Sequence, residues 1–248
     1  MLVRITDYCT MGCTHCMVNA GESGEHMDIE MFKWVFEFSV FYNMYLFLSG
    51  GEPTSHPQFI EMLEFIRNAK IPFFKVLILS NGMFLEDKKY TDKILDFGYQ
   101  VQISNDSRFY PKRVKEVNHP LLTYVNMITQ VAPFGRAIEN KIEVDQRFPG
   151  CFNLRSVAQN FDSFREVIFY LRYPAGKFCT PSINTDGSIS AGETPFCSLI
   201  GTVNSTGDEL LNNIRSMSCN SCGLDKNLTG EHAVWWKKMN REKSCERK

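Results

Sequence analysis

The sequence predicts an α/β protein whose parallel strands bend into a full or partial barrel, followed by a small cysteine-bearing extension. Short apolar runs alternate with amphipathic helical segments up to about residue 140, as in βαβ units with a parallel sheet. Polar and glycine-rich turns follow these runs, where the functional loops of a barrel lie. After Gly150 the pattern changes to a hairpin and further cysteines.

The first part of the chain contains the predicted parallel strands and their crossover helices. Strands are predicted at residues 2–6, 44–48, 75–79, 99–104 and 122–129, and helices at residues 28–42, 56–70, 86–97 and 111–118. The run at 44–48 is almost entirely apolar, which is typical of a strand buried on both faces. Asp28 is a favourable N-cap for the first helix.

The second part is predicted to form the extension. Residues 182–190 alternate polar and apolar side chains around Asp186-Gly187, a strong hairpin signal. A helix is predicted at residues 208–217, just before Cys219 and Cys222. We therefore expect a core over residues 1–150 and an extension over residues 151–248.

Composition limits the class of protein. The chain has 248 residues, 44% apolar and 22% charged, with a net charge of −1. This is enough for a full core and argues against disorder, and the neutral balance argues against general nucleic-acid binding. No signal peptide or membrane-spanning segment is recognisable, so we expect a cytoplasmic protein without a membrane partner. The nine cysteines then need a role other than disulfide bonding.

The first cysteine group is Cys9-x3-Cys13-x2-Cys16, directly after the first predicted strand. Three closely spaced thiolates can hold three irons of a cubane and leave the fourth iron open to a chelating cofactor. Two other interpretations remain: a zinc site with His15 as the fourth ligand, or simply buried cysteines.

A second motif, Gly50-Gly51-Glu52-Pro53, follows the second strand. Together with the cysteine motif it resembles the radical S-adenosylmethionine (radical SAM) superfamily, over about 140 residues. His15 stands at the position that is usually aromatic in that family. The resemblance implies that the Gly-Gly-Glu-Pro turn meets the methionine amino group of the cofactor, since glycines allow close backbone approach.

The resemblance also extends to later turns. It implies further contacts to S-adenosylmethionine from Ser80 and Asn81 after the third strand and from Ser104 and Asp106 after the fourth. Arg136 lies in a Gly-Arg-Ala segment common in members with a cysteine-rich extension. The fold implied is a partial (β/α)6 TIM-like barrel with a small α+β extension.

The second cysteine group comprises Cys179, Cys197, Cys219 and Cys222. Four thiolates are the number for a fully ligated 4Fe–4S cluster, and the arrangement resembles the SPASM or twitch auxiliary-cluster extension. It is similar to that of the family of 2-deoxy-scyllo-inosamine dehydrogenases. Gly192 occupies a position where the longer SPASM version carries a cysteine, so a second auxiliary cluster is not expected.

Two alternatives remain for the second cysteine group. One is a zinc knuckle with four thiolate ligands, which fits the same spacing, and the other is that these cysteines are ordinary core residues. Cys151 and Cys245 are left over as bystanders, although Cys151 could also act as a hydrogen donor or an extra ligand.

The resemblance implies that an electron from the first cluster cleaves S-adenosylmethionine to methionine and a 5′-deoxyadenosyl radical, which abstracts hydrogen from a substrate. It further implies an electron donor such as flavodoxin or ferredoxin, and an oxidative reaction in which the auxiliary cluster accepts an electron. Because the first cluster cysteine is residue 9, we expect no N-terminal peptide-recognition domain. A peptide and a small molecule, such as an aminocyclitol or nucleotide, remain equal substrate candidates.

No general base is assigned from the sequence. The alternative function is a non-enzymatic zinc-ribbon interaction protein that uses both cysteine groups structurally.

Overall fold

The computed structural model describes residues 1–42, 45–72, 75–128, 131, 134–143, 154–171, 180–193 and 197–217. Within these residues eight strands form one sheet in the order β5-β4-β3-β2-β1-β6-β7-β8. The strands are β1 (Leu2–Thr6), β2 (Leu46–Gly50), β3 (Val76–Ser80), β4 (Gln100–Ser104), β5 (Leu122–Val125), β6 (Ser182–Ile183), β7 (Ser188–Ser190) and β8 (Leu199–Thr202).

Strands β1 to β6 pair in parallel, whereas β6/β7 and β7/β8 are antiparallel. The prediction of a mostly parallel α/β sheet of the partial-barrel type is therefore confirmed. The hairpin around Asp186-Gly187 is also confirmed, but its first strand pairs with β1 instead of standing apart in the extension. The register Leu2↔Ser182 and Val3↔Ile183 brings the extension against the first strand of the core.

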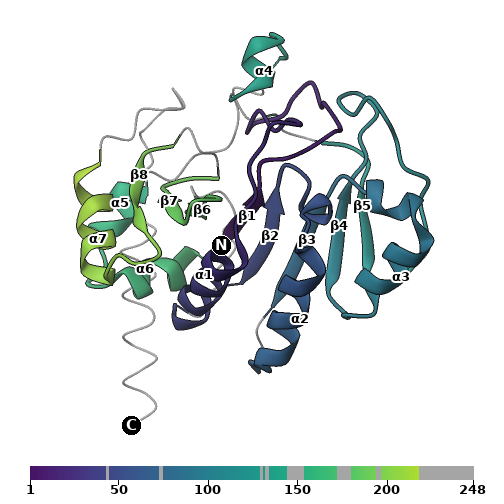
Figure 1. Ribbon diagram of the computed structural model, residues 1–248. Coiled ribbons are helices and arrows are strands. Elements are labelled where there is room, and N and C mark those ends of the chain that lie inside the picture. Colours follow the sequence, from purple (N-terminus) through teal and green to yellow (C-terminus); the bar gives the residue numbers. More distant parts are fainter. Residues whose placement is uncertain are drawn as a thin grey trace, which may run out of the picture.

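Helices connect and flank the strands (Figure 1). They are α1 (Ile29–Phe41), α2 (Phe59–Ala69), α3 (Lys88–Leu95), α4 (Arg136–Glu139), α5 (Leu154–Ala158), α6 (Phe164–Leu171) and α7 (Gly207–Ser216), with 3-10 turns η1 (Pro53–Ser55) and η2 (Met83–Glu86). Asp28 caps α1 as predicted, because its side chain accepts a hydrogen bond from the Met31 amide at 2.8 Å. Figure 1 shows the loop after β1 and helix α4 together at the upper end of the sheet.

The helix predicted at residues 111–118 is wrong, because this segment has no helical structure. Side chains from neighbouring strands bond its main chain: Asn105 bonds both the amide and the carbonyl of Val114, and the Tyr124 hydroxyl bonds Val117. These bonds replace the i to i+4 bonds that a helix would need. The strand predicted at 122–129 ends at Val125, and β2 lies two residues later than predicted.

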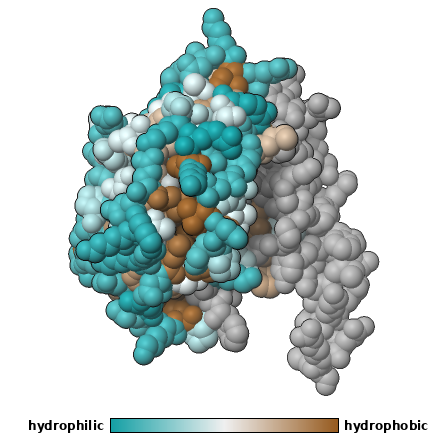
Figure 2. Space-filling model, turned by 90° about the vertical axis from the view of Figure 1, so that its right-hand side faces the viewer, coloured by the Kyte–Doolittle hydropathy of each residue, from teal (hydrophilic) through white to brown (hydrophobic). Residues whose placement is uncertain are grey.

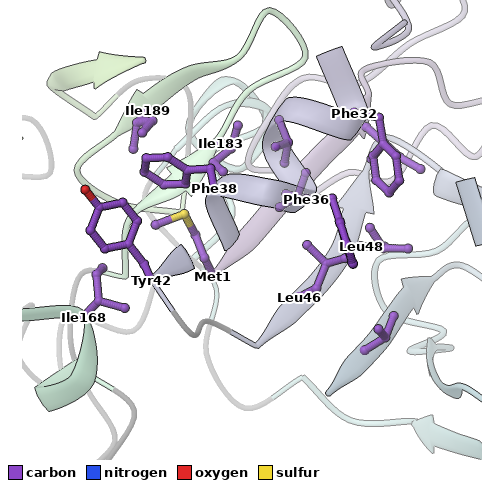
Figure 3. Packing of buried hydrophobic residues seen from close by; sticks show 14 of the residues in the cluster. Met1, Phe32, Phe36, Phe38, Tyr42, Leu46, Leu48, Ile168, Ile183 and Ile189 are labelled. Carbon is purple, nitrogen blue, oxygen red and sulfur yellow. The ribbon is translucent and has the colours of Figure 1, made fainter. Parts of the chain in front are cut away.

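One hydrophobic core joins the parallel strands to the extension. Phe38 and Tyr42, at the end of the α1 region, lie beside Ile183 of β6, Ile189 of β7 and Ile168 of α6 (Figure 3). The predicted boundary at residue 150 falls outside the described residues, but side chains from both sides of it share this core.

The opposite end of the sheet is the edge strand β5. Figure 2 shows the face on this side, where apolar side chains form a central band bordered by hydrophilic ones. Val117 and Met127, which flank β5 in the sequence, are exposed. In the described part of the chain no helix has the length and hydropathy that a membrane crossing requires.

Candidate active site

The loop between β1 and α1 carries the first cysteine group and is tied back to itself. The Asp7 amide donates to the Glu25 carbonyl at 2.8 Å, and the Cys9 amide donates to the Gly21 carbonyl at 3.0 Å. The Thr6 hydroxyl also donates to the Glu25 carbonyl, at 3.0 Å. These bonds fix Cys9 close to the carboxyl end of β1. We call residues 7–28 the cluster loop.

Cys9, Cys13 and Cys16 pack into one small apolar cluster, and none is in a disulfide. The Met11 amide donates to Cys9 Sγ at 3.4 Å, and Asn81 Nδ2 lies 3.8 Å from the same sulfur. Burial raises the pKa of Cys13 to about 12, and the neighbouring Cys9 and Cys16 add to the rise. Thiols in such a setting become stable thiolates only beside a strong positive charge, such as that of bound iron.

The first residue of helix α4 holds the cluster loop through hydrogen bonds to its main chain. The Arg136 amide donates to the Cys16 carbonyl at 2.9 Å, while its side chain donates to the carbonyls of Cys13 (Nε, 2.8 Å) and Ala20 (Nη1, 2.8 Å). Gly135 has φ +56°, and a Cβ there would lie 2.5 Å from the Cys16 carbonyl oxygen. In this structure Arg136 therefore holds the main chain that presents the cysteines, and a contact to the cofactor stays a prediction.

The glycines of the Gly-Gly-Glu-Pro turn are required by the cluster loop itself. A Cβ on Gly50, which has φ +148°, would lie 2.1 Å from the Thr6 carbonyl oxygen, and one on Gly51 would lie 2.3 Å from that of Tyr8. The Gly51 amide donates to the Thr6 carbonyl at 2.7 Å, and the Glu52 amide donates to the Tyr8 carbonyl at 2.8 Å. The missing side chains thus allow two main chains to touch, a reason that the motif alone does not reveal.

Glu52 links the carboxyl ends of β2 and β3. Its Oε1 accepts hydrogen bonds from the Thr54 amide (3.1 Å), the Thr54 hydroxyl (2.7 Å) and the Ser80 hydroxyl (2.8 Å), and Oε2 accepts one from the Asn81 amide (2.7 Å). Glu52 is 1% exposed. Burial raises the pKa of its carboxyl group, and these hydrogen bonds oppose the rise. Pro53, the next residue, is buried and begins η1.

His15, at the usually aromatic position of the cysteine motif, packs against the loop that follows β4. The His15 ring lies 4.6 Å from that of Phe109 and 5.3 Å from that of Tyr110, centroid to centroid. Burial lowers the pKa of His15, and its Nδ1 has no hydrogen-bond partner among the described residues. Tyr110 shares a side-chain hydrogen bond with Ser104 at the end of β4. The Phe109 carbonyl accepts the Thr14 amide at 3.1 Å, so the two loops form one unit.

Asp106 stabilises that same loop. Its carboxylate accepts hydrogen bonds from the Arg108 amide (3.0 Å), from Arg108 Nε (2.9 Å) and from the Ile128 amide (2.6 Å). The hydrogen bonds from the Arg108 side chain are the main cause that holds the pKa of Asp106 well below its usual range. Asp106 is 1% exposed and ties the β4 loop to the segment after β5. Its predicted contact to the cofactor stays a prediction.

Of the second cysteine group the structure describes Cys197, which is half-buried and not in a disulfide. A Cβ on Gly192 would lie 2.7 Å from Cys197 Sγ, so the position that carries a cysteine in the longer SPASM extension adjoins this thiol. The other three members of the group, Cys179, Cys219 and Cys222, lie outside the described residues, as do Cys151 and Cys245. Among the described residues no three His, Cys, Asp or Glu side chains are grouped to hold a single metal ion.

Sequence reasoning missed the residues that lock the predicted ones in place. Arg108, Phe109 and Tyr110 follow the predicted Asn105-Asp106 turn directly, and an arginine and two aromatic residues beside a polar turn were an available signal. Arg4, in the middle of β1, is the other omission. A charged residue inside a strand that is otherwise apolar marks an unusual environment.

The fold and the cluster loop together define an α/β partial barrel that presents three cysteines at the carboxyl end of its first strand. The chain belongs to the Radical SAM superfamily, whose family model matches residues 3–128. This membership supports a radical SAM enzyme over the alternative of a zinc-ribbon interaction protein. It also implies a 4Fe–4S cluster and S-adenosylmethionine, and the three thiols of the cluster loop, none of them in a disulfide, are donors of the type that such a cluster needs.

Solved structures are similar in fold. BtrN in complex with AdoMet and 2-DOIA has a TM-score of 0.58 at 13% identity, over 91% of this chain and 90% of that one. Selenomethionine BtrN in an open conformation has a TM-score of 0.53 at 14% identity, over 92% and 89%. Streptococcus suis SuiB bound to the precursor peptide SuiA has a TM-score of 0.51 at 14% identity, over 90% and 69%. Comparison with curated proteins finds no match.

Proposed function

We propose that this protein uses Cys9, Cys13 and Cys16 to hold a 4Fe–4S cluster with one open iron, and oxidises its substrate by abstracting hydrogen. The arrangement of the three thiols carries this proposal: they share one apolar cluster, are free of disulfides, and lie on a loop clamped by Arg136. When bound, the cluster supplies the electron that cleaves S-adenosylmethionine to methionine and the 5′-deoxyadenosyl radical.

The chain's own residues position this chemistry. Gly50 and Gly51 bring the end of β2 against the cluster loop, and this turn would hold the methionine amino group of the cofactor. Ser80 and Asn81 are held beside the turn that follows β2, because both donate hydrogen bonds to Glu52. Phe109 and Tyr110 pack against His15 and reduce the access of water from that side, which limits side reactions of a radical.

The second cysteine group is proposed to hold an auxiliary 4Fe–4S cluster through Cys179, Cys197, Cys219 and Cys222. Four thiolates leave no open iron, so electron transfer is the chemical role available to it. A substrate that loses a hydrogen atom to the radical would then lose a proton to a base and an electron to this cluster, and would be oxidised by two electrons in total. The reaction is thus of the oxidoreductase type. Cys197, the member of this group that the structure describes, is half-buried and not in a disulfide, as a cluster ligand must be.

Two substrate classes remain, a peptide and a small molecule such as an aminocyclitol or nucleotide. Structures similar in fold have been solved with one of each: BtrN with 2-DOIA and SuiB with the precursor peptide SuiA. A soluble donor such as flavodoxin or ferredoxin would supply the electron for each turnover. We propose a cytoplasmic location, in keeping with unpaired thiols and reduced clusters.

Anaerobic reconstitution followed by reduction in the presence of S-adenosylmethionine tests this proposal. We expect 5′-deoxyadenosine and methionine in equal amounts, measured by mass spectrometry, even without substrate at a slow rate. The variant in which Cys9, Cys13 and Cys16 are all replaced by Ala is expected to form neither. Equal formation by this variant, or a colourless protein that contains zinc in place of iron, would refute the proposal.

A further inference from the structure

Arg4 is a buried cation with an unused hydrogen-bond donor. The residue is 1% exposed. Its Nη1 donates to the Glu193 carbonyl at 3.0 Å, whereas Nη2 is buried and has no partner among the described residues. Burial lowers the pKa of Arg4, and a guanidinium remains charged even so. A buried donor without an acceptor costs free energy, and this one is held in place by the strand that carries it.

The side chain of Arg4 points to the face of the sheet opposite the main core. Val3 and Ile5, its neighbours on β1, are fully buried in the hydrophobic core, and successive side chains of a strand point to opposite faces. Since Leu2 pairs with Ser182 and Val3 with Ile183, Asn184 is the next position of the adjoining chain beside Arg4.

A second unused polar atom lies on that adjoining segment. Asn184 donates through Nδ2 to the hydroxyls of Ser188 (2.8 Å) and Ser190 (3.1 Å), but its Oδ1 is buried and has no partner among the described residues. Ser190 and its strand partner Ser182 are fully buried polar residues. The junction of β1, β6 and β7 therefore offers one free donor and one free acceptor in a polar patch of the interior.

Charge determines what this patch can accept. Asp7, Asp186 and Cys197 lie close enough to Arg4 to interact with it electrostatically. With two carboxylates beside one guanidinium, the positive charge is already matched, so an additional phosphate or carboxylate would be repelled. A hydroxyl group suits the patch better, because it accepts one hydrogen bond and donates another.

The position also matters. Asp7 is two residues before Cys9, and Arg4 interacts electrostatically with both Asp7 and Cys197, so Arg4 lies between the cluster loop and Cys197. We propose that Arg4 and Asn184 form a substrate-recognition point for a hydroxyl group of a non-anionic small molecule, a polyol or an aminopolyol. This inference rests on the proposed function and specifies its substrate class.

Binding to the reconstituted full-length protein with S-adenosylmethionine tests this recognition point. The probes are matched pairs with and without phosphate: myo-inositol and inositol 1-phosphate, glucosamine and glucosamine 6-phosphate, uridine and uridine 5′-monophosphate. A neutral peptide, N-acetyl-Ala-Ala-amide, is the seventh probe. Dissociation constants are measured by anaerobic calorimetry, and 5′-deoxyadenosine formation is measured in the same samples with and without each probe.

The decisive variant is Arg4→Lys. Lysine keeps the charge beside Asp7, but it lacks the second guanidinium nitrogen. Arg4→Gln, which keeps an NH2 donor without the charge, is a second variant in case the first unfolds. Arg67→Lys is the matched control, because Arg67 lies on α2 with its side chain 49% exposed. Thermal unfolding and cluster absorbance show which variants are folded and loaded.

At least one unphosphorylated hydroxyl compound is expected to bind wild type and to stimulate cofactor cleavage, with its phosphorylated partner at least tenfold weaker. Arg4→Lys is expected to weaken that binding about tenfold, whereas Arg67→Lys should bind the probe as wild type does. Tighter binding of the phosphorylated members, binding of the peptide alone, binding of none, or an unaffected Arg4→Lys would overturn the inference. Loss of cleavage in wild type without any probe would instead refute the proposed function.

Discussion

The side-chain amide nitrogen of Asn81 lies 3.8 Å from the sulfur of Cys9. This contact joins the end of β3 to the first cysteine of the cluster loop, across 72 positions of sequence. The main-chain amide of Asn81 in turn donates a hydrogen bond to the carboxylate of Glu52 at the end of β2. Asn81 thus links the carboxyl ends of β2 and β3 to the first thiol of the cluster loop.

Metal content separates the two cysteine groups. Two cubane clusters are expected to give about eight irons and eight sulfides per chain after anaerobic reconstitution. Replacing Cys9, Cys13 and Cys16 together by Ala should reduce both counts by half, measured by iron and sulfide analysis. Four irons plus one zinc in wild type would contradict the auxiliary cluster and leave the first cluster intact.

Gly51→Ala is expected to disturb the cluster loop itself. The added Cβ would lie 2.3 Å from the Tyr8 carbonyl oxygen and 2.9 Å from that of Asp7, so one of the two main chains must move. Iron content and cofactor cleavage should both fall at least severalfold. Gly21→Ala is the control on the same loop, because a Cβ there meets nothing within 4 Å. Equal cluster content in both variants would show that the close approach is unimportant.

Glu52→Gln is expected to destabilise the ends of β2 and β3. The substitution places an NH2 group against donors such as the Ser80 hydroxyl and the Asn81 amide, and leaves buried groups unpaired. The free energy of unfolding should decrease by about 1–3 kcal/mol, measured by anaerobic denaturation. Glu64→Gln, at an exposed position of α2, should change it little. An unchanged stability of Glu52→Gln would mean that the network relaxes without cost.

Asp106→Asn should reveal a pH-dependent contribution to stability. The pKa of Asp106 is lowered in the folded protein, chiefly by hydrogen bonds from Arg108, so the carboxylate stabilises the fold above its ordinary pKa of about 4. This contribution is lost as the pH falls through the lowered pKa of the folded state. The difference in melting temperature between wild type and variant should therefore shrink from pH 7 toward pH 3. A constant difference, or the same trend in the exposed control Asp96→Asn, would contradict it.

Cys197→Ala tests the role of the second group. If the auxiliary cluster accepts the substrate's electron, a folded variant should still cleave the cofactor in the presence of substrate but fail to release the oxidised product. Product and 5′-deoxyadenosine are measured together by mass spectrometry. Circular dichroism excludes simple unfolding, since cluster loss can destabilise the segment that it holds. Normal release of the oxidised product would leave the cluster a structural role only.

The order of strands, turns and cysteines was readable in the sequence because each depends on local chemistry. Apolar runs defined the parallel strands, Asp28 defined the start of α1, and Asp186-Gly187 defined the hairpin. The spacing of Cys9, Cys13 and Cys16 placed them on a single loop. The family match confirms the class of enzyme that these motifs indicated.

Contacts formed in the tertiary structure decided the features that local sequence patterns did not predict. Residues 111–118 are not helical because the side chains of Asn105 and Tyr124 bond their main chain. Strand β6, from a distant part of the chain, pairs with β1 and extends the sheet. Gly51 is needed where two main chains touch. Arg4 became a candidate only when burial removed water from its second nitrogen. In each case the cause is a contact with another element of the folded chain, which no local pattern specifies.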